Sequence, residues 1–385
     1  MPRLACSRSS RVPPSDKNAT APERGVRMQG STQPLVSVIT PVYNGEKFLA
    51  ECLESVRMQT YANFEHIIVN NCSTDATLQI AEAHAAKDPR VRVHTNTTFV
   101  SALENHNIAL KRISAESRYV KVVQADDWIY PECIAQMVAV ALQYPSIGLV
   151  SAYRLDGTAV TLDGLPYPSP FVPGAEVCRQ SLLTDLYVFG SPTSLLMRAD
   201  LVRSRPVFYD EARFALEADY AACYEILQTS DFGFVHQILT CTRRHQAQQT
   251  TIIIQLRSYM VGRIRVLDHY GPVYLSAEEH SRRRKEMIRK YLRMIGWRAL
   301  HETDEKFWRF HRKALAEFGY PNVSRTIAVA SIGAVAHKIG EALHQIGQAL
   351  KAAAVGGSRL IAQAMRKAEP AARDRSGAET GKETA

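Results

Sequence analysis

The chain has 385 residues, of which 46% are apolar and 22% are charged, and its formal net charge is +9. That length suffices for one large domain and a smaller one, and the composition is that of an ordinary globular protein. The positive charge favours an anionic partner, whether a phosphate compound, a membrane surface or a nucleic acid. Because the basic residues are not interleaved with aromatic ones on any clear face, we expect no nucleic-acid partner.

The seven cysteines are scattered, odd in number and without a Cys-x-x-Cys pair. We interpret them as reduced core residues of a cytoplasmic protein. No run of residues is expected to be apolar enough to span a bilayer, and no apolar segment follows the arginines near the N-terminus. We therefore expect a protein that is neither exported nor integral to a membrane.

Residues 1–33 are rich in Ser, Pro and Arg and nearly lack large apolar side chains, which predicts a disordered tail. From 34 to 250 apolar runs alternate with helical patterns, which predicts an α/β domain with a parallel, doubly wound sheet. The Gly- and Pro-rich stretch at 156–173 is expected to be a loop over one sheet edge. Strands are predicted at 35–40, 64–69, 91–94, 119–123, 147–152, 194–200 and 234–241, and a helix at 208–226.

After residue 250 helical periodicity predicts a helical region at 251–320, an amphipathic helical tail at 321–368 and disorder at 369–385. The basic run at Arg282–Lys285 and the apolar stripe of the tail fit two alternatives. One is peripheral contact with an anionic membrane surface; the other is docking of the tail on the rest of the chain or on another helix. Few aromatic residues mark the stripe, which favours docking. The stripe consists of Ile332, Val335, Ile339, Leu343, Ile346 and Leu350.

Two adjacent carboxylates, Asp126 and Asp127, directly follow the strand predicted at 119–123. Ligands bind at the carboxyl ends of strands in open α/β sheets. Divalent cations that carry phosphates take oxygen ligands, usually one or two carboxylates. The pair therefore predicts a metal–diphosphate site, although Asp-Asp at a strand end is also common in turns. Several other classes of site are excluded, because the sequence has no G-x-G-x-x-G after its first strand, no P-loop, no H-E-x-x-H and no G-x-S-x-G.

Four segments resemble, in their order and approximate spacing, those of family 2 glycosyltransferases. They are Val36–Asn44 (VSVITPVYN), Leu53–Tyr61, Ile68–Asp75 (IVNNCSTD) and Gln124–Pro131 (QADDWIYP). The resemblance covers residues 34 to about 245. It implies the GT-A fold, which is Rossmann-like with a mostly parallel central sheet and flanking helices. It also implies inverting transfer from a nucleotide-sugar donor with Mn²⁺ or Mg²⁺.

The resemblance assigns nucleotide-binding roles to five positions. Pro41 and Tyr43 match residues that contact the base, and Asn71 matches a residue that reads the base edge. Asn107 matches the Asn of the helix before the acidic motif, and Asp126 matches the residue at the ribose or diphosphate.

The metal site of the family would be formed here by Asp127 together with Asp126. The sequence departs from the family pattern at two places, one at the nucleotide base and one at this metal site. Asn70 and Asn71 stand where the family commonly has Asp, and an amide donates as well as accepts hydrogen bonds. Gln124 stands where many members have the first Asp of D-x-D, so metal binding would rest on the Asp126–Asp127 pair alone.

The general base of the family matches Asp219, which Tyr220 follows, and Glu217 is the second candidate. The alternative is that both acids merely stabilise a helix N-terminus. Three further residues are candidate donor or acceptor contacts, each with a structural alternative. These are Trp128, which could instead be a core aromatic residue, His245, which could be structural, and Arg244, which could lie in a solvated basic turn.

Processive members of the family carry a Q-x-x-R-W motif and membrane spans, and we find neither in this sequence, so the resemblance implies a non-processive enzyme. It would transfer one sugar, from a UDP-sugar by preference, to a hydroxyl of a saccharide or lipid-linked acceptor, as in cell-surface polysaccharide or glycoconjugate synthesis. The protein would be cytoplasmic, or peripheral at the inner face of the cytoplasmic membrane. The alternative function is a non-catalytic nucleotide-sugar-binding or scaffolding protein with a degenerate site.

Overall fold

The computed structural model describes residues 33–184, 186–214, 217–245 and 254–373. The predicted disordered N-terminal tail lies outside this part of the chain except for its last residue. Residues from Leu35 onward form one compact unit built on a ten-stranded sheet. Its first half contains, in chain order, β1 (Val36–Val42), α1 (Leu49–Arg57), β2 (Phe64–Asn70), α2 (Thr77–Ala85), β3 (Val91–Thr95), α3 (Ala102–Leu110), β4 (Tyr119–Val122), β5 (Trp128–Ile129), α4 (Cys133–Gln143) and β6 (Ile147–Asp156).

The second half begins with short elements and ends in long helices. These are β7 (Ala159–Thr161), β8 (Phe171–Val172), α5 (Gly174–Leu183), the 3-10 turn η1 (Pro192–Ser194), β9 (Leu196–Arg198), α6 (Ala199–Arg203), α7 (Glu211–Phe214), α8 (Ala218–Ile226), β10 (Asp231–Thr242), α10 (Tyr259–Tyr274), α11 (Ala277–Arg298), α12 (Glu305–Glu317) and α13 (Val323–Arg373).

The sheet confirms the α/β prediction but is mixed rather than parallel throughout. Its order is β3-β2-β1-β4-β9-β6-β10-β5. The first four strands are parallel, as the strand–helix alternation predicts, and β6 and β10 are also parallel. Between these groups β9 runs antiparallel to both neighbours. A strand of three residues gives too little sequence to reveal its direction.

Two sequence predictions are wrong in detail. The stretch at 156–173 is not only a loop, because β7 and β8 lie within it and pair with β6 and β10. The helix expected at 208–226 is two helices, α7 and α8. In both cases apolar periodicity alone could not locate where short elements begin and end.

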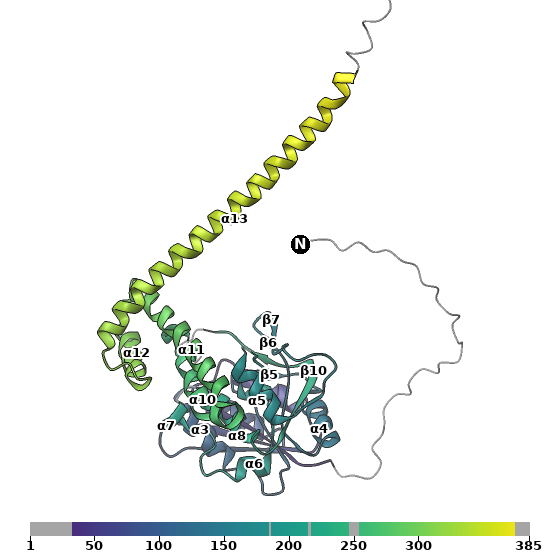
Figure 1. The fold of residues 1–385 in the computed structure, drawn as a ribbon. Helices are drawn as coiled ribbons and strands as arrows, with labels where there is room; N and C mark the ends of the chain where they lie inside the picture. The colour runs from purple at the N-terminus through teal and green to yellow at the C-terminus, as the bar shows by residue number, and fades with distance from the viewer. Residues whose placement is uncertain (1–32, 185, 215–216, 246–253, 374–385) are drawn as a thin grey trace, which may run out of the picture. The chain divides into compact units, whose positions relative to one another are not determined.

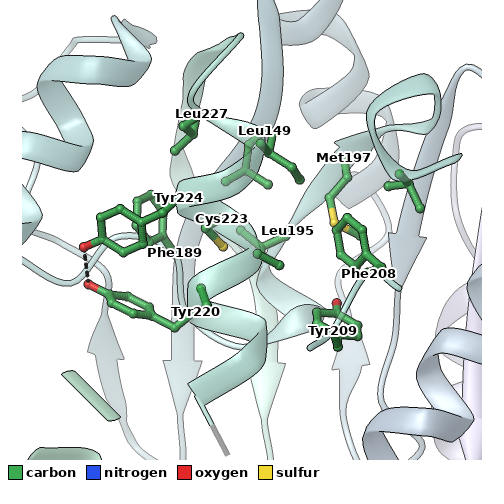
Figure 2. Packing of buried hydrophobic residues seen from close by; sticks show 14 of the residues in the cluster. Leu149, Phe189, Leu195, Met197, Phe208, Tyr209, Tyr220, Cys223, Tyr224 and Leu227 are labelled. Atoms are coloured by element: carbon green, nitrogen blue, oxygen red, sulfur yellow. Dashed lines mark hydrogen bonds between the residues drawn. The ribbon is translucent and has the colours of Figure 1, made fainter. Parts of the chain in front are cut away.

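Apolar side chains on the two faces of the sheet form separate cores. Val38 of β1 points into a core with α1 and α4, whereas its neighbour Ile39 points into a core with α3, α5, α8 and α10. Figure 2 shows part of the second core, where Tyr220, Cys223 and Tyr224 of α8 pack near sheet residues such as Leu149. These contacts fix α8 on the sheet.

The helical region after residue 250 is joined to this core rather than separate from it. Val266, Leu267 and Tyr270 on one face of α10 belong to the second core, and its other residues Val261 and Ile264 belong to a cluster with α11 and α12. The last helix, α13, continues to Arg373, past the predicted end of the tail at 368 (Figure 1).

One helix in the described part of the chain is long and apolar enough to cross a bilayer, which corrects the expectation that none exists. It is the stretch Val323–Gln348 of α13. The sequence did not reveal it because its Ala, Val and Ile residues raise the mean hydropathy without an unbroken run of large apolar residues. Length and composition alone do not place it in a membrane, because core helices of globular proteins pass the same test.

Candidate active site

The adjacent carboxylates lie in the turn after β4, and a buried lysine positions that turn. Lys121, in the middle of β4, donates from Nζ to the carbonyl oxygen of Thr193 at 2.6 Å. The hydroxyl of Thr193 accepts from the backbone N–H of Gln124 at 3.1 Å. Burial of a charged group is costly unless the group forms hydrogen bonds, so the contact of Lys121 with Thr193 is a structural one. Together these two hydrogen bonds hold η1 against the turn that carries Asp126 and Asp127.

Asp127 is almost completely buried, with 1% of its surface exposed. Its carboxylate accepts from the backbone N–H of Arg243 at 3.2 Å and from the Thr242 hydroxyl at 3.4 Å. Burial and the adjacent charge of Asp126 raise the pKa of Asp127 to about 7, although hydrogen bonds and the Arg154 guanidinium partly oppose them. The ionised form of this carboxyl is therefore disfavoured by its surroundings, and a cation bound at the two aspartates would stabilise it.

The end of β10 brings a basic segment to the aspartates, because Cys241 of β10 pairs with Trp128 of β5. The Arg243 guanidinium lies 4.7 Å from the ring centroids of both Phe48 and Trp128. From Nε it donates to the backbone oxygen of Asp126 at 3.1 Å. The predicted contact Trp128 thus lies beside the acidic pair and supports Arg243.

His245 and Arg244, the other two predicted contacts, differ in their partners. His245 Nε2 lies 3.0 Å from Asp126 Oδ2, and its ring packs 4.7 Å from that of Phe48. Arg244 instead forms an ion pair with Asp156 at the end of β6. The structure therefore brings His245 to the carboxylates and holds Arg244 to one side of them.

Arg154 of β6 is a buried cation among acidic residues. It is 5% exposed and forms an ion pair with Asp156 at 3.0 Å. Burial raises the pKa of Asp127 and of Asp219, and the charge of Arg154 opposes both rises as a smaller influence. The ring of Tyr187 lies 5.7 Å from its guanidinium. Sequence reasoning missed Arg154, because an Arg within a strand carries no motif.

Asp219 and Glu217 lie at the start of α8, where Asp219 Oδ1 accepts from the backbone N–H of Tyr220 at 2.7 Å. Burial raises the pKa of Asp219 to about 6. Burial, and then the charge of Asp219, raise the pKa of Glu217 to about 8, while Arg263 acts in the opposite direction. Both groups titrate near neutral pH, as a general base should.

The start of α8 is held by helices that follow it in the chain. Arg263 of α10 donates to the Tyr220 hydroxyl at 3.2 Å, and this hydroxyl shares a hydrogen bond with Ser181 of α5 at 2.6 Å. A Cβ added at Gly262 would lie 1.8 Å from Cγ of Glu217, so only glycine allows this approach of α10 to Glu217. The helical region therefore positions both predicted catalytic acids.

On the nucleotide side, Pro41 is buried within β1, and Tyr43 just beyond the strand is 48% exposed. The Tyr43 ring lies 4.7 Å from that of Phe99, which is also exposed. Asn44 has a φ of +48°, a conformation that Asn tolerates better than most residues, and its Oδ1 accepts from the Thr74 N–H at 2.9 Å. This bond ties the loop after β1 to the loop after β2.

Asn71 and Asn107 are both buried and bonded to backbone. Asn71 donates to the carbonyl of Val100 at 2.9 Å and accepts from its N–H at 3.1 Å. Asn107 accepts from the N–H of Tyr209 at 2.8 Å and donates to its carbonyl at 3.1 Å. Each amide therefore holds a segment near the site, and the roles at the base that the resemblance implies for them stay predictions.

The sequence of this chain is similar to those of known glycosyltransferases. A sequence profile described as Glycosyl transferase family 2 matches residues 37–203. A protein named putative glycosyltransferase EpsH, from Bacillus subtilis, is 36% identical over 132 residues, which are 34% of this chain and 37% of EpsH. The uncharacterized glycosyltransferase RT0329 of Rickettsia typhi is 30% identical over 240 residues, 60% of this chain and 71% of that protein. The chain belongs to glycosyltransferase family 2. This confirms the family that its motifs resemble, and membership makes it a transferase.

The fold agrees with that of a solved glycosyltransferase. The crystal structure of residues 1–349 of S. aureus TarS in complex with UDP-GlcNAc superposes with a TM-score of 0.55 at 19% identity, covering 74% of this chain and 80% of that one. At this identity the likeness confirms the GT-A fold and nothing finer. The matched segment spans little more than a third of EpsH, so the activity of the whole protein is inferred below.

Proposed function

We propose that this family 2 glycosyltransferase transfers one sugar from a nucleotide diphosphate sugar to an acceptor hydroxyl, with inversion and without processivity. The observation that carries the proposal is the acidic pair at the carboxyl end of β4, where Asp127 is buried and Asp126 lies 3.0 Å from His245 Nε2. The donor diphosphate would bind at this pair, and the Asp219 carboxyl, whose pKa burial raises to about 6, would receive the proton of the acceptor hydroxyl. The exposed rings of Tyr43 and Phe99 offer a stacking surface for the base.

A divalent cation, Mn²⁺ or Mg²⁺, fits the chemistry of the acidic pair but not a site made by protein alone. Within the described residues no group of three or more His, Cys, Asp or Glu side chains could hold a metal. Asp126 and Asp127 supply two carboxylates, and diphosphate oxygens and water would complete the octahedral preference of Mg²⁺. When bound, the cation would neutralise charge on the leaving diphosphate. The raised pKa of Asp127 supports this assignment, because the carboxylate lacks a compensating positive charge.

The remaining chemistry is assigned to the protein itself. The Asp219 carboxylate would accept the proton of the acceptor hydroxyl as that oxygen attacks the sugar, with Glu217 as the second candidate. Burial raises the pKa of Asp219 to about 6, and the charge of Arg154 would limit this rise and so favour the deprotonated carboxylate. His245 would orient Asp126 through the 3.0 Å contact between Nε2 and Oδ2.

The names of relatives support a UDP-sugar and a polymer acceptor. TarS, which is named a poly(ribitol-phosphate) β-N-acetylglucosaminyltransferase, is 28% identical over 178 residues. Its structure contains UDP-GlcNAc. We therefore favour a UDP-sugar as donor and a saccharide or lipid-linked acceptor in polysaccharide or glycoconjugate synthesis, on the cytoplasmic side of the membrane.

Thermal stabilisation by UDP, GDP, dTDP and CMP, each with and without Mn²⁺, tests the donor site. A ligand that binds only the folded state increases the free energy of unfolding by RT ln(1 + [L]/Kd) and so raises Tm. The increase is about 2.7 kcal/mol when the ligand concentration is a hundred times Kd. UDP with Mn²⁺ should stabilise the protein, and Asp127→Ala should lose this response. Asp200→Ala should keep it, because Asp200 is an exposed carboxylate that forms an ion pair with Arg198 at 2.7 Å. No response to any nucleotide would contradict the donor site.

Turnover distinguishes an enzyme from a nucleotide-sugar-binding scaffold. Asp219→Asn should retain the Mn²⁺-dependent Tm increase with UDP but lose hydrolysis or transfer of the UDP-sugar. A wild-type protein that binds UDP and shows no turnover with any acceptor mixture would instead support the scaffold.

A further inference from the structure

Helix α13 carries an apolar stripe that faces solvent. Six apolar side chains recur every three or four residues along its middle, and each is at least 39% exposed. The most exposed, Ile332, is 72% accessible. These exposures exclude docking of the stripe side chains on the rest of the unit, which is one part of the alternative that the sequence favoured; the other part is pairing with another helix. The stripe comprises Ile332, Val335, Ile339, Leu343, Ile346 and Leu350.

The opposite face of α13 is the one that packs on α11. Ala334 is buried, and a Cβ added at Gly296 of α11 would lie 2.1 Å from the carbonyl oxygen of Ala330. At 100° per residue Ala330 and Ala334 lie on the side of the helix away from Ile332 and Ile339. Docking therefore uses this face of α13, on which Val323 and Ile327 also pack against the cluster with α11 and α12, and leaves the apolar stripe directed outward.

The helices around the stripe contain the entire positive surplus of the protein. Residues 277–373 contain 19 Lys and Arg against 9 Asp and Glu, a net charge of +10, compared with +9 for the whole chain. The remainder of the sequence is therefore close to neutral. An exposed apolar stripe within a helical region of net positive charge is complementary to a surface that is apolar beneath and anionic at its border.

We propose that α13 binds the surface of an anionic phospholipid bilayer, with its apolar stripe inserted among the acyl chains near the headgroups. The polar face of its middle carries Lys338 and His337, both paired with Glu341, at 2.9 and 3.2 Å. A spanning helix would carry these groups into hydrocarbon, whereas a helix parallel to the surface keeps them in water. Pairing with a second copy would bring two positively charged helices together, which an anionic surface does not.

Flotation of the full-length protein with lipid vesicles tests the proposal. Vesicles of phosphatidylcholine with about a third phosphatidylglycerol should carry the protein upward, and pure phosphatidylcholine vesicles should carry much less. Salt of about 0.5 M should release the protein by screening the charges. The double variant Ile339→Asn and Ile346→Asn should lower the partition coefficient at least about tenfold. The matched control, Gln345→Asn and Gln348→Asn, places the same residue on the polar face and should bind like wild type.

Four results would overturn the proposal. Three come from flotation: failure of the wild-type protein to float with anionic vesicles, equal loss of binding in both double variants, and retention of the protein on vesicles in high salt as expected for a spanning helix. The fourth is a dimer in solution that only the isoleucine variant dissociates, which would assign the stripe to a second copy. None of these readouts requires sugar transfer, so this proposal can fail while the proposed function stands.

Discussion

The identity of the general base can be decided from pH dependence, because the two candidate carboxyls titrate at different pH. Burial raises the pKa of Asp219 to about 6 and that of Glu217 to about 8. A general base acts in its deprotonated form, so activity rises as pH passes its pKa. At pH 7 a base with a pKa of 6 is about 90% deprotonated, and one with a pKa of 8 about 10%. With Asp219 as base, kcat therefore levels off soon above pH 6.

Substitution sharpens the distinction. Asp219→Asn should lower kcat by about 10²- to 10⁴-fold if Asp219 is the base. If Glu217 is the base, the same substitution removes a neighbouring negative charge, which lowers the pKa of Glu217 and moves the rise in activity to lower pH. Glu217→Gln is the matched control, and with Asp219 as base it should retain the plateau and its midpoint near pH 6.

The assay is release of the nucleotide diphosphate, followed from pH 5 to 9 at saturating Mn²⁺ and donor. Saturation matters because Asp127 also has a raised pKa, and a cation competes with its proton. A pH midpoint that shifts with Mn²⁺ concentration therefore reports Asp127, and one that does not reports the base. Full activity in Asp219→Asn together with inactivity of Glu217→Gln would refute the assignment, and so would a pH-independent kcat.

Three further predictions concern stability. The folded pKa of Asp127 is raised from 3.8 to about 7, so its stabilising contribution is complete below pH 4 and lost as pH rises through 7. In EDTA, urea unfolding should therefore show Asp127→Asn more stable than wild type at pH 8, by about 4 kcal/mol at most, with the difference vanishing near pH 4. Asn107→Ala leaves the buried backbone groups of Tyr209 unpaired and should lower the unfolding free energy by about 2 kcal/mol, measured the same way. Gly296→Val should detach α13 from α11 because no side chain fits against Ala330, and limited proteolysis should then cleave within 299–322 faster than in wild type; unchanged cleavage would contradict this packing.

The sequence was most informative where a local pattern determines a local structure. The motif segments after β1, β2 and β4 contain turn-forming Asn and Asp residues, and the structure places these loops at the carboxyl ends of neighbouring parallel strands. Asp126 and Asp127 could be selected for that reason. Arg154 could not, because its role depends on β6 lying two strands from β4, and that order arises from the antiparallel insertion of β9.

The structural role of a residue that a motif identifies also depends on its contacts in the folded protein. Asn107 could be matched to a family position, but only the fold shows that its amide spans to the backbone of Tyr209, about a hundred residues later. For α13 the periodicity was visible in the sequence, whereas the direction of the stripe was not. That direction depends on Ala330 and Ala334 being the residues that meet α11.

The contact of α10 with the start of α8 determines how much of the chain must be kept for transfer. The segment matched by the family profile ends at residue 203, before Asp219. A fragment cut after β10 would lose Arg244 and His245 and would also lack Gly262 and Arg263, which contact Glu217 and Tyr220. We therefore expect an active fragment to need α10 and the helices behind it, because Phe307 and Leu315 of α12 complete the cluster against which α10 packs. The exposed stripe of α13 lies outside these contacts, so removal of residues after 331 should leave the packing at the start of α8 intact.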